Sequence, residues 1–142
     1  KYGIFTLVIL GPDDIELRKS WPEESFIHFL NDEYPIDDIA AILSCCKFLV
    51  SNDSGIMNLG FSLGIPGVGL FGPTNSKKHE GWYGNCALIQ SKYNSICPSC
   101  YGTDRYKECA RIPPLCMEAI TVDEVLKKIE EFYVQQTQCV II

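Results

Sequence analysis

Three short apolar runs constrain the fold of this chain more than any other feature. They are Phe5–Leu10, Phe48–Ser51 and Val68–Phe71, and none of them contains a charged residue. Short continuous apolar runs bounded by turn residues are typical of strands that are buried on both faces, as in a parallel sheet. We therefore expect these three runs to be central strands of one parallel sheet.

Helix signals separate the apolar runs. Asp37 is placed to cap a helix with an apolar face, and Ser54 or Asp53 to cap a second helix that Gly64 ends. Thr121 opens a capping-box sequence before a final helix. Strands that alternate with helices in this way predict an α/β fold, with a Rossmann-like open parallel sheet and helices on both faces.

Charge and length exclude several classes of function. The 142 residues carry a net charge of −6, which disfavours non-specific binding to nucleic acid and to anionic membranes. No stretch reaches the roughly 18 apolar residues of a transmembrane helix. An anionic ligand remains compatible with this composition, because backbone N–H groups at a helix N-terminus hold phosphate even in an acidic protein.

The segment after Phe48–Ser51 is the strongest candidate for a phosphate site. In an open α/β sheet, ligands bind beyond the carboxyl ends of the strands, where the first N–H groups of the next helix lack partners. Gly55 would let an anion approach the backbone, and Ser54 adds a hydroxyl. Asp53 repels phosphate and suits a sugar or ribose hydroxyl. The alternative is an ordinary capped helix that follows a strand.

A longer pattern distinguishes these alternatives. Asp53-Ser54-Gly55-Ile56-Met57-Asn58 is followed by Gly64-Ile65-Pro66 and then by Phe71-Gly72-Pro73-Thr74. Together these segments resemble the signature of glycosyltransferase family 9, the ADP-heptose–lipopolysaccharide heptosyltransferase family. That family usually has His where this chain has Asn58, and Asn donates a hydrogen bond but carries no charge.

The resemblance implies a GT-B fold, in which two Rossmann-like domains face each other across a cleft. Residues 1–142 correspond to the second, donor-binding domain, and an N-terminal acceptor domain with the proposed catalytic carboxylate is missing. The implied enzyme is a bacterial inverting glycosyltransferase that needs no cofactor. It would transfer heptose or a related sugar from an ADP-heptose-like nucleotide sugar to a lipopolysaccharide-core acceptor, in the cytoplasm at the inner membrane. The chain alone would then bind donor without transferring sugar.

The same resemblance suggests which residues contact the donor, with none of them catalytic: Asp53, Ser54, Gly55, Met57 and Asn58, followed by the weaker candidates Asp14, Tyr34 and Gly72. Tyr34 would stack on the base, and Asp14 would accept hydrogen bonds from ribose hydroxyls. A solvated acid and an ordinary loop aromatic explain these last two residues equally well. The two histidines, His28 and His79, are isolated in the sequence and receive no role.

A cysteine-rich loop is expected at residues 97–116. It contains Cys97, Cys100, Cys109 and Cys116, and the first two form the Cys-x-x-Cys spacing of a zinc half-site. A structural zinc ion, one or more disulfides and free thiols all remain open. A stand-alone nucleotide- or sugar-binding module, assembled through this loop, is the alternative function. The parent gene would decide, because an upstream Rossmann-like half supports the glycosyltransferase.

Overall fold

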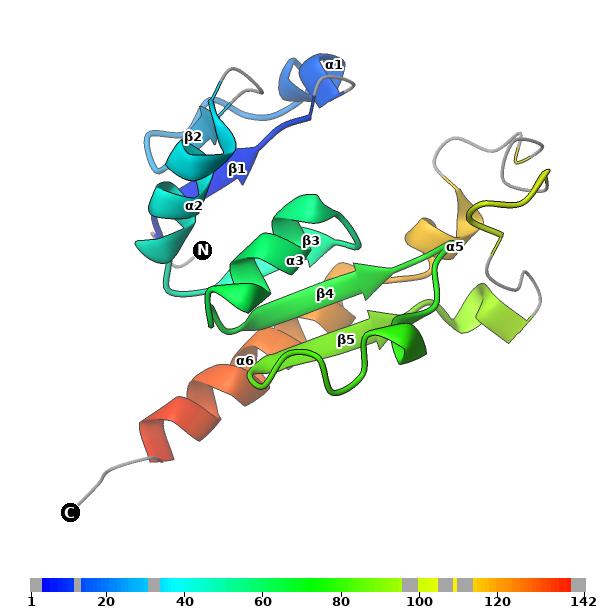
Figure 1. Cartoon of the computed structure of the whole chain (residues 1–142). Helices are drawn as coiled ribbons and strands as arrows, with labels where there is room; N and C mark the ends of the chain where they lie inside the picture. Colours follow the sequence, from blue (N-terminus) through cyan, green and yellow to red (C-terminus); the bar gives the residue numbers. More distant parts are fainter. Residues whose placement is uncertain are drawn as a thin grey trace. The chain divides into compact units, whose positions relative to one another are not determined.

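The computed structural model describes residues 4–11, 14–30, 34–95, 100–104, 109 and 114–138. The chain divides into two compact units, Lys1–Ala41 and Ile42–Ile142 (Figure 1).

The first unit contains a pair of parallel strands. β1 (Thr6–Ile9) pairs with β2 (Ile27–Leu30), and the one-turn helix α1 (Ile15–Arg18) lies in the connection between them. The backbone N–H of Leu10 donates to the carbonyl of Leu30 at 2.9 Å, which extends the pairing beyond the strands. This β-α-β order is that of a parallel crossover.

Helix α2 (Ile36–Ser44) follows, and the division between the units falls inside it. The prediction that Asp37 caps this helix is wrong, because Asp37 lies within the first helical turn. The backbone N–H of Ile39 bonds to the carbonyl of Pro35 at 3.1 Å, so the helical hydrogen bonds begin two residues earlier than expected. Asp37 instead lies where its negative charge favours the helix dipole.

The second unit contains a three-stranded parallel sheet. Its strands are β3 (Leu49–Asn52), β4 (Gly67–Phe71) and β5 (Cys86–Gln90), in that spatial order. The helices whose residues are described in this unit include α3 (Gly55–Ser62), α5 (Leu115–Glu118) and α6 (Val122–Gln138), with the 3-10 turns η2 (Ser76–Lys78) and η3 (Lys92–Ser95). The predicted Rossmann-like α/β fold, with parallel strands that alternate with helices, is confirmed.

The strands form two sheets rather than one. In the described part of the chain β1 pairs with β2, while β3, β4 and β5 form the second sheet. The predicted central position of Phe5–Leu10 is not observed, since Phe5 is 68% exposed and β1 has a single hydrogen-bonded neighbour. An apolar run predicts a buried strand, but it does not specify which strand lies next to it.

Both faces of β4 carry a helix. Gly67, Gly69 and Phe71 face α3, and a Cβ atom on Gly67 would lie only 2.8 Å from the Phe61 ring. Leu70 points to the opposite face, where it lines an apolar hollow together with the α6 residues Val122, Val125 and Leu126. Glycine in this strand thus lets α3 approach the sheet closely.

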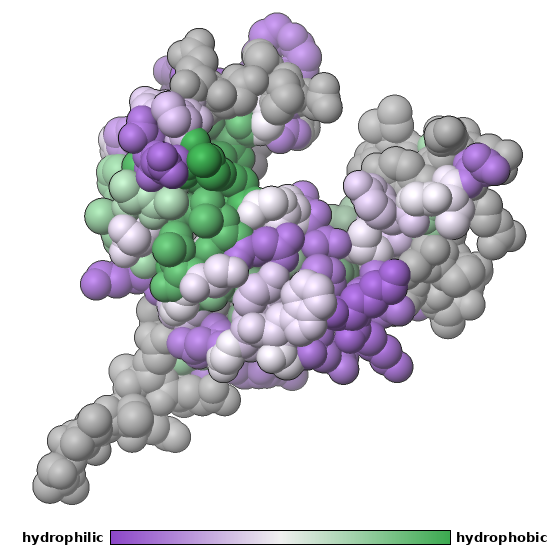
Figure 2. Space-filling model, in the orientation of Figure 1, coloured by the Kyte–Doolittle hydropathy of each residue, from purple (hydrophilic) through white to green (hydrophobic). Residues whose placement is uncertain are grey.

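The core of the second unit lies between α3 and the sheet. Met57 and Phe61 of α3 are buried against Phe71 of β4, and Leu88 of β5 packs on this cluster. Tyr83, in the connection between β4 and β5, also packs against this cluster. Figure 2 shows white and purple residues over this connection, so its outer surface is of mixed to hydrophilic character.

Local signals fix both ends of α3. Ser54 caps its start, and Gly64 follows its end with a φ of +80°, a conformation that favours glycine. The N–H of Gly64 bonds to the Phe61 carbonyl at 3.0 Å, and the N–H of Ile65 to the Gly60 carbonyl at 3.2 Å. These two bonds form a Schellman motif, as the sequence predicted for a Gly64 stop.

Candidate functional site

The turn between β3 and α3 lies at the carboxyl end of β3. The Asp53 N–H bonds to the Leu70 carbonyl at 3.0 Å, which ties the turn to β4. Ser54 is extended, with φ −155°, and its hydroxyl accepts a hydrogen bond from the Met57 N–H at 3.3 Å. The turn thus delivers Asp53 and Ser54 to the end of the sheet where ligands bind in such folds.

The first turn of α3 offers donors to an anion. Neither the Gly55 nor the Ile56 backbone N–H has an acceptor among the described residues. A Cβ atom on Gly55 would meet nothing within 4 Å, so the space beside this backbone is open. Unpaired N–H groups and the positive end of the helix dipole together favour a phosphate group there.

Asp53 faces a histidine across this site. The Nε2 atom of His79 lies 4.0 Å from the Oδ1 atom of Asp53, and both side chains are more than four-fifths buried. His79 comes from the connection between β4 and β5, directly after η2. A carboxylate and an imidazole therefore lie beside the open N-terminus of α3.

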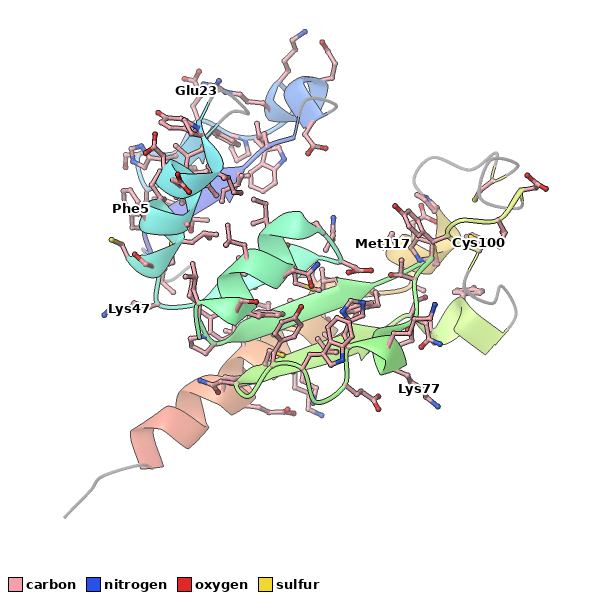
Figure 3. All side chains as sticks on the ribbon, in the orientation of Figure 1. Phe5, Glu23, Lys47, Lys77, Cys100 and Met117 are labelled. Atoms are coloured by element: carbon pink, nitrogen blue, oxygen red, sulfur yellow. The ribbon has the colours of Figure 1, made fainter. Side chains whose placement is uncertain are left out.

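Gln90 of β5 holds the start of that connection in place. Its side-chain N–H₂ group donates to the carbonyls of Phe71 at 3.0 Å and Thr74 at 3.2 Å, while its oxygen accepts from the Ser76 N–H at 2.9 Å. The side chain of Lys77 extends away from the sheet (Figure 3), so η2 exposes its charged residues to solvent. One amide thus fixes the path of the backbone that leads to His79.

The Asn58 side chain forms two hydrogen bonds with other residues of the chain. Its N–H₂ group donates to the Ser54 carbonyl at 3.0 Å, and its oxygen accepts a hydrogen bond from the Tyr83 hydroxyl. The pKa of Tyr83 is raised by burial first, and then by the nearby Cys86 and Asp53. The hydroxyl therefore keeps its proton and remains a donor to Asn58.

Two of the predicted donor residues are buried. Met57 is 0% exposed in the core, so only its backbone is placed near the turn. Gly72 is also buried, and a Cβ atom there would lie 2.3 Å from the Met117 sulfur and 3.2 Å from the Cys116 sulfur. Figure 3 shows Met117 beside the carboxyl end of β4. Packing against α5 thus accounts for glycine at position 72.

Asp14 and Tyr34 belong to the first unit, whereas the β3–α3 turn belongs to the second. The Asp14 carboxylate accepts a hydrogen bond from the Gly11 N–H at 2.9 Å, which closes the turn after β1. Tyr34 is 45% exposed. Their donor contacts stay predictions.

The cysteine segment differs from the predicted loop. Cys116 lies in helix α5 (Leu115–Glu118). The side chains of Cys116 and Cys100 are both buried. Cys109 is exposed, and Cys97 lies outside the described residues. Among the residues with described positions, no three His, Cys, Asp or Glu side chains converge as metal ligands. The four-cysteine zinc site stays a prediction.

Three residues of this region were not found from the sequence: His79, Tyr83 and Gln90. His79 follows the carboxyl end of β4 in the chain, and that strand is the neighbour of β3. The rule that ligands bind beyond neighbouring strand ends would have drawn attention to the segment after Phe71. No sequence pattern indicates the long-range pairing of Tyr83 with Asn58.

No helix in the described parts of the chain has the length and apolar character needed to cross a membrane.

No curated protein and no solved structure matches the chain. A protein-family model, however, matches residues 33–109, which include β3, α3, β4 and the connection that carries His79. The matching model is that of glycosyltransferase family 9 (heptosyltransferase), and the chain belongs to this family.

Proposed function

We propose that this chain is the donor-binding domain of an inverting glycosyltransferase, and that it holds the diphosphate of a nucleotide sugar at the N-terminus of α3. The observation that carries the proposal is the pair of unpartnered N–H groups of Gly55 and Ile56, beside open space. Family membership supplies the class of ligand, since family 9 enzymes use nucleotide sugars. The structure contributes a site whose dipole and donors suit a diphosphate.

The residues of the turn would contact different parts of the donor, according to their charge and hydrogen-bonding groups. Gly55 and Ile56 offer backbone donors to phosphate oxygens, and the Ser54 hydroxyl adds a further polar group beside them. Asp53 is an acceptor, so it suits a hydroxyl of the sugar or the ribose. Asn58 contributes indirectly, because its amide holds the first turn of α3 against Tyr83.

The proposed reaction transfers heptose or a related sugar from an ADP-heptose-like donor to a lipopolysaccharide-core acceptor. Direct displacement at the anomeric carbon inverts its configuration, and the bond to the diphosphate breaks as the bond to the acceptor oxygen forms. Negative charge then builds up on the departing diphosphate. Fixed N–H groups at α3 stabilise that charge without any reorganisation. We assign the acceptor and the base that deprotonates it to the other domain of the GT-B fold.

An NMR titration tests the proposal. With ¹⁵N-labelled chain, ADP and ADP-heptose should shift the amide signals of Ser54, Gly55, Ile56 and Met57, with a dissociation constant on the order of millimolar for ADP. Adenosine, which lacks the diphosphate, is the control and should shift these signals far less. Shifts confined to other segments would remove the β3–α3 turn from the binding site.

A further inference from the structure

His79 and Asp53 form a pair at the edge of the proposed donor site. Their facing atoms, Nε2 and Oδ1, are 4.0 Å apart, and the side chains are 18% and 16% exposed. The Asp53 carboxylate forms no hydrogen bond with another described residue. The oxygens of Asp53 are not among the buried, unpartnered atoms of the described residues, so they remain accessible and can accept a hydrogen bond from a ligand.

The imidazole of His79 is held by aromatic rings. Its centroid lies 5.4 Å from that of Phe71 and 4.9 Å from that of Trp82. The His79 N–H bonds to the Ser76 carbonyl at 2.8 Å, and the Ser76 N–H bonds to Gln90. Phe71 is fully buried, so one of the two rings that contact His79 belongs to the core. The imidazole is therefore placed before any ligand arrives.

The environment of the ring selects its tautomer. The Nδ1 atom is buried and has no hydrogen-bond partner among the residues whose positions are described. A proton on Nδ1 would bury an N–H group without an acceptor, whereas a proton on Nε2 faces the Asp53 carboxylate. We therefore expect the Nε2–H tautomer at His79.

We propose that His79 is a positioning residue for Asp53, and that its Nε2–H group orients the carboxylate to accept a hydrogen bond from a hydroxyl of the nucleotide sugar. The role rests on the proposed function of the β3–α3 turn. At 4.0 Å the pair is too long for a hydrogen bond in the free chain. The distance should shorten when a ligand hydroxyl orders the carboxylate, as hydrogen bonds at unliganded sites commonly do.

The free chain provides the first test. Long-range ¹H–¹⁵N NMR spectra of the imidazoles should show the Nε2–H tautomer for His79, and Asp53→Asn should shift its ring signals. His28, which stacks on Phe5 in the first unit at 4.6 Å, is the internal control and should not respond. An Nδ1–H tautomer at His79, or a ring that ignores Asp53→Asn, would overturn the pairing.

Binding of ADP-heptose provides the second test. His79→Phe, which keeps an aromatic ring, and Asp53→Asn should each raise the dissociation constant about tenfold, and the double variant should bind no more weakly than Asp53→Asn. His79→Gln retains a side-chain N–H and should restore most of the affinity, while His28→Phe should match the wild type. Equal weakening of ADP binding would identify the ribose as the source of the hydroxyl.

The outcomes separate the two proposals. If the wild type binds ADP-heptose but the effects of His79→Phe and Asp53→Asn simply add, His79 does not act through Asp53 and the inference is wrong. If His79→Phe and His79→Gln both bind like the wild type, it is also wrong. If the wild type binds neither ADP nor ADP-heptose, the proposed function fails and the hydroxyl-binding role fails with it, whatever tautomer His79 shows.

Discussion

The Tyr83 hydroxyl donates a hydrogen bond to the side-chain oxygen of Asn58 in the first turns of α3. Asn58 in turn donates to the carbonyl of Ser54, the N-cap residue of the same helix. The connection between β4 and β5 is thereby attached to the end of α3 that we propose to bind diphosphate. The same connection also places His79 beside Asp53, so one segment supports both sides of the turn.

Replacing Tyr83 with Phe should destabilise the second unit by about 0.5–1.5 kcal/mol, because the Asn58 oxygen loses its partner. The ring should stay packed against Phe61, since their centroids are 5.3 Å apart and Phe keeps the ring. Urea unfolding of the wild type and the variant measures the difference. Tyr34→Phe, at an exposed tyrosine of the first unit, is the matched control and should leave the midpoint unchanged.

Stability should also fall at alkaline pH. Burial raises the pKa of Cys86 above its ordinary value of 9.0, and burial together with Cys86 and Asp53 raises the pKa of Tyr83 above 10.0. Above those ordinary values the unfolded chain releases protons that the folded chain retains, so the free energy of unfolding decreases as pH rises. Well below pH 9.0 these groups contribute no slope, because both states hold the protons.

Urea midpoints measured in steps from about pH 8 to pH 11 should therefore be flat at first and then decline. Tyr83→Phe should make the decline shallower above about pH 10, where Tyr83 contributes. A midpoint that rises over this range would contradict the assignment, since it would require the folded chain to lose its protons first.

A methyl group at Gly67 should be strongly destabilising. A Cβ atom there would lie 2.2 Å from the Leu49 carbonyl oxygen and 2.8 Å from the Phe61 ring. Since the first neighbour is backbone of the adjacent strand, relief requires β3 to move, and we expect Gly67→Ala to cost about 1–3 kcal/mol. Gly84→Ala is the control, because no atom lies within 4 Å of its Cβ position. Equal unfolding midpoints for the two variants would show that β4 and α3 are less closely packed than described.

The sequence predicted best those features that depend on neighbouring residues. A cap at Ser54 or Asp53 and a stop at Gly64 were predicted because each signal acts within one turn of the chain, and Ser54 is the cap that the structure shows. The error at Asp37 has the same origin, since Asp is suitable both as an N-cap and within the first turn. Apolar character likewise predicted β4, which is buried along almost its whole length.

Features that depend on residues far apart in the chain were less predictable. The placement of β1 in a separate sheet depends on strand pairing, which apolar runs do not encode. His79 was judged isolated because its partner Asp53 lies on another element, and only the order of the strands brings the two together. Met57 was predicted to contact the donor, but its side chain belongs to the core. A sequence motif does not separate residues that contact a ligand from residues that support the turn.

Gly55→Ala separates binding from folding at the proposed diphosphate site. Gly55 is the first residue of α3, its φ is not positive, and no atom lies within 4 Å of its Cβ position. Alanine should therefore stabilise the helix by about 0.4–1 kcal/mol, because the unfolded chain loses freedom while the folded chain accepts the methyl. A Cβ atom points toward the N-terminus of its helix, so the same methyl would project into the space proposed for the diphosphate.

The variant should therefore unfold at a higher urea concentration than the wild type while its dissociation constant for ADP, measured by NMR titration, rises about tenfold. Gly84→Ala adds the same methyl at another open position outside α3 and should leave ADP binding unchanged. A variant that is more stable but binds ADP more weakly is a result that a purely structural role of Gly55 does not produce. If Gly55→Ala gains stability and binds ADP as well as the wild type, no phosphate lies against the first turn of α3, and the nucleotide must bind elsewhere on the chain.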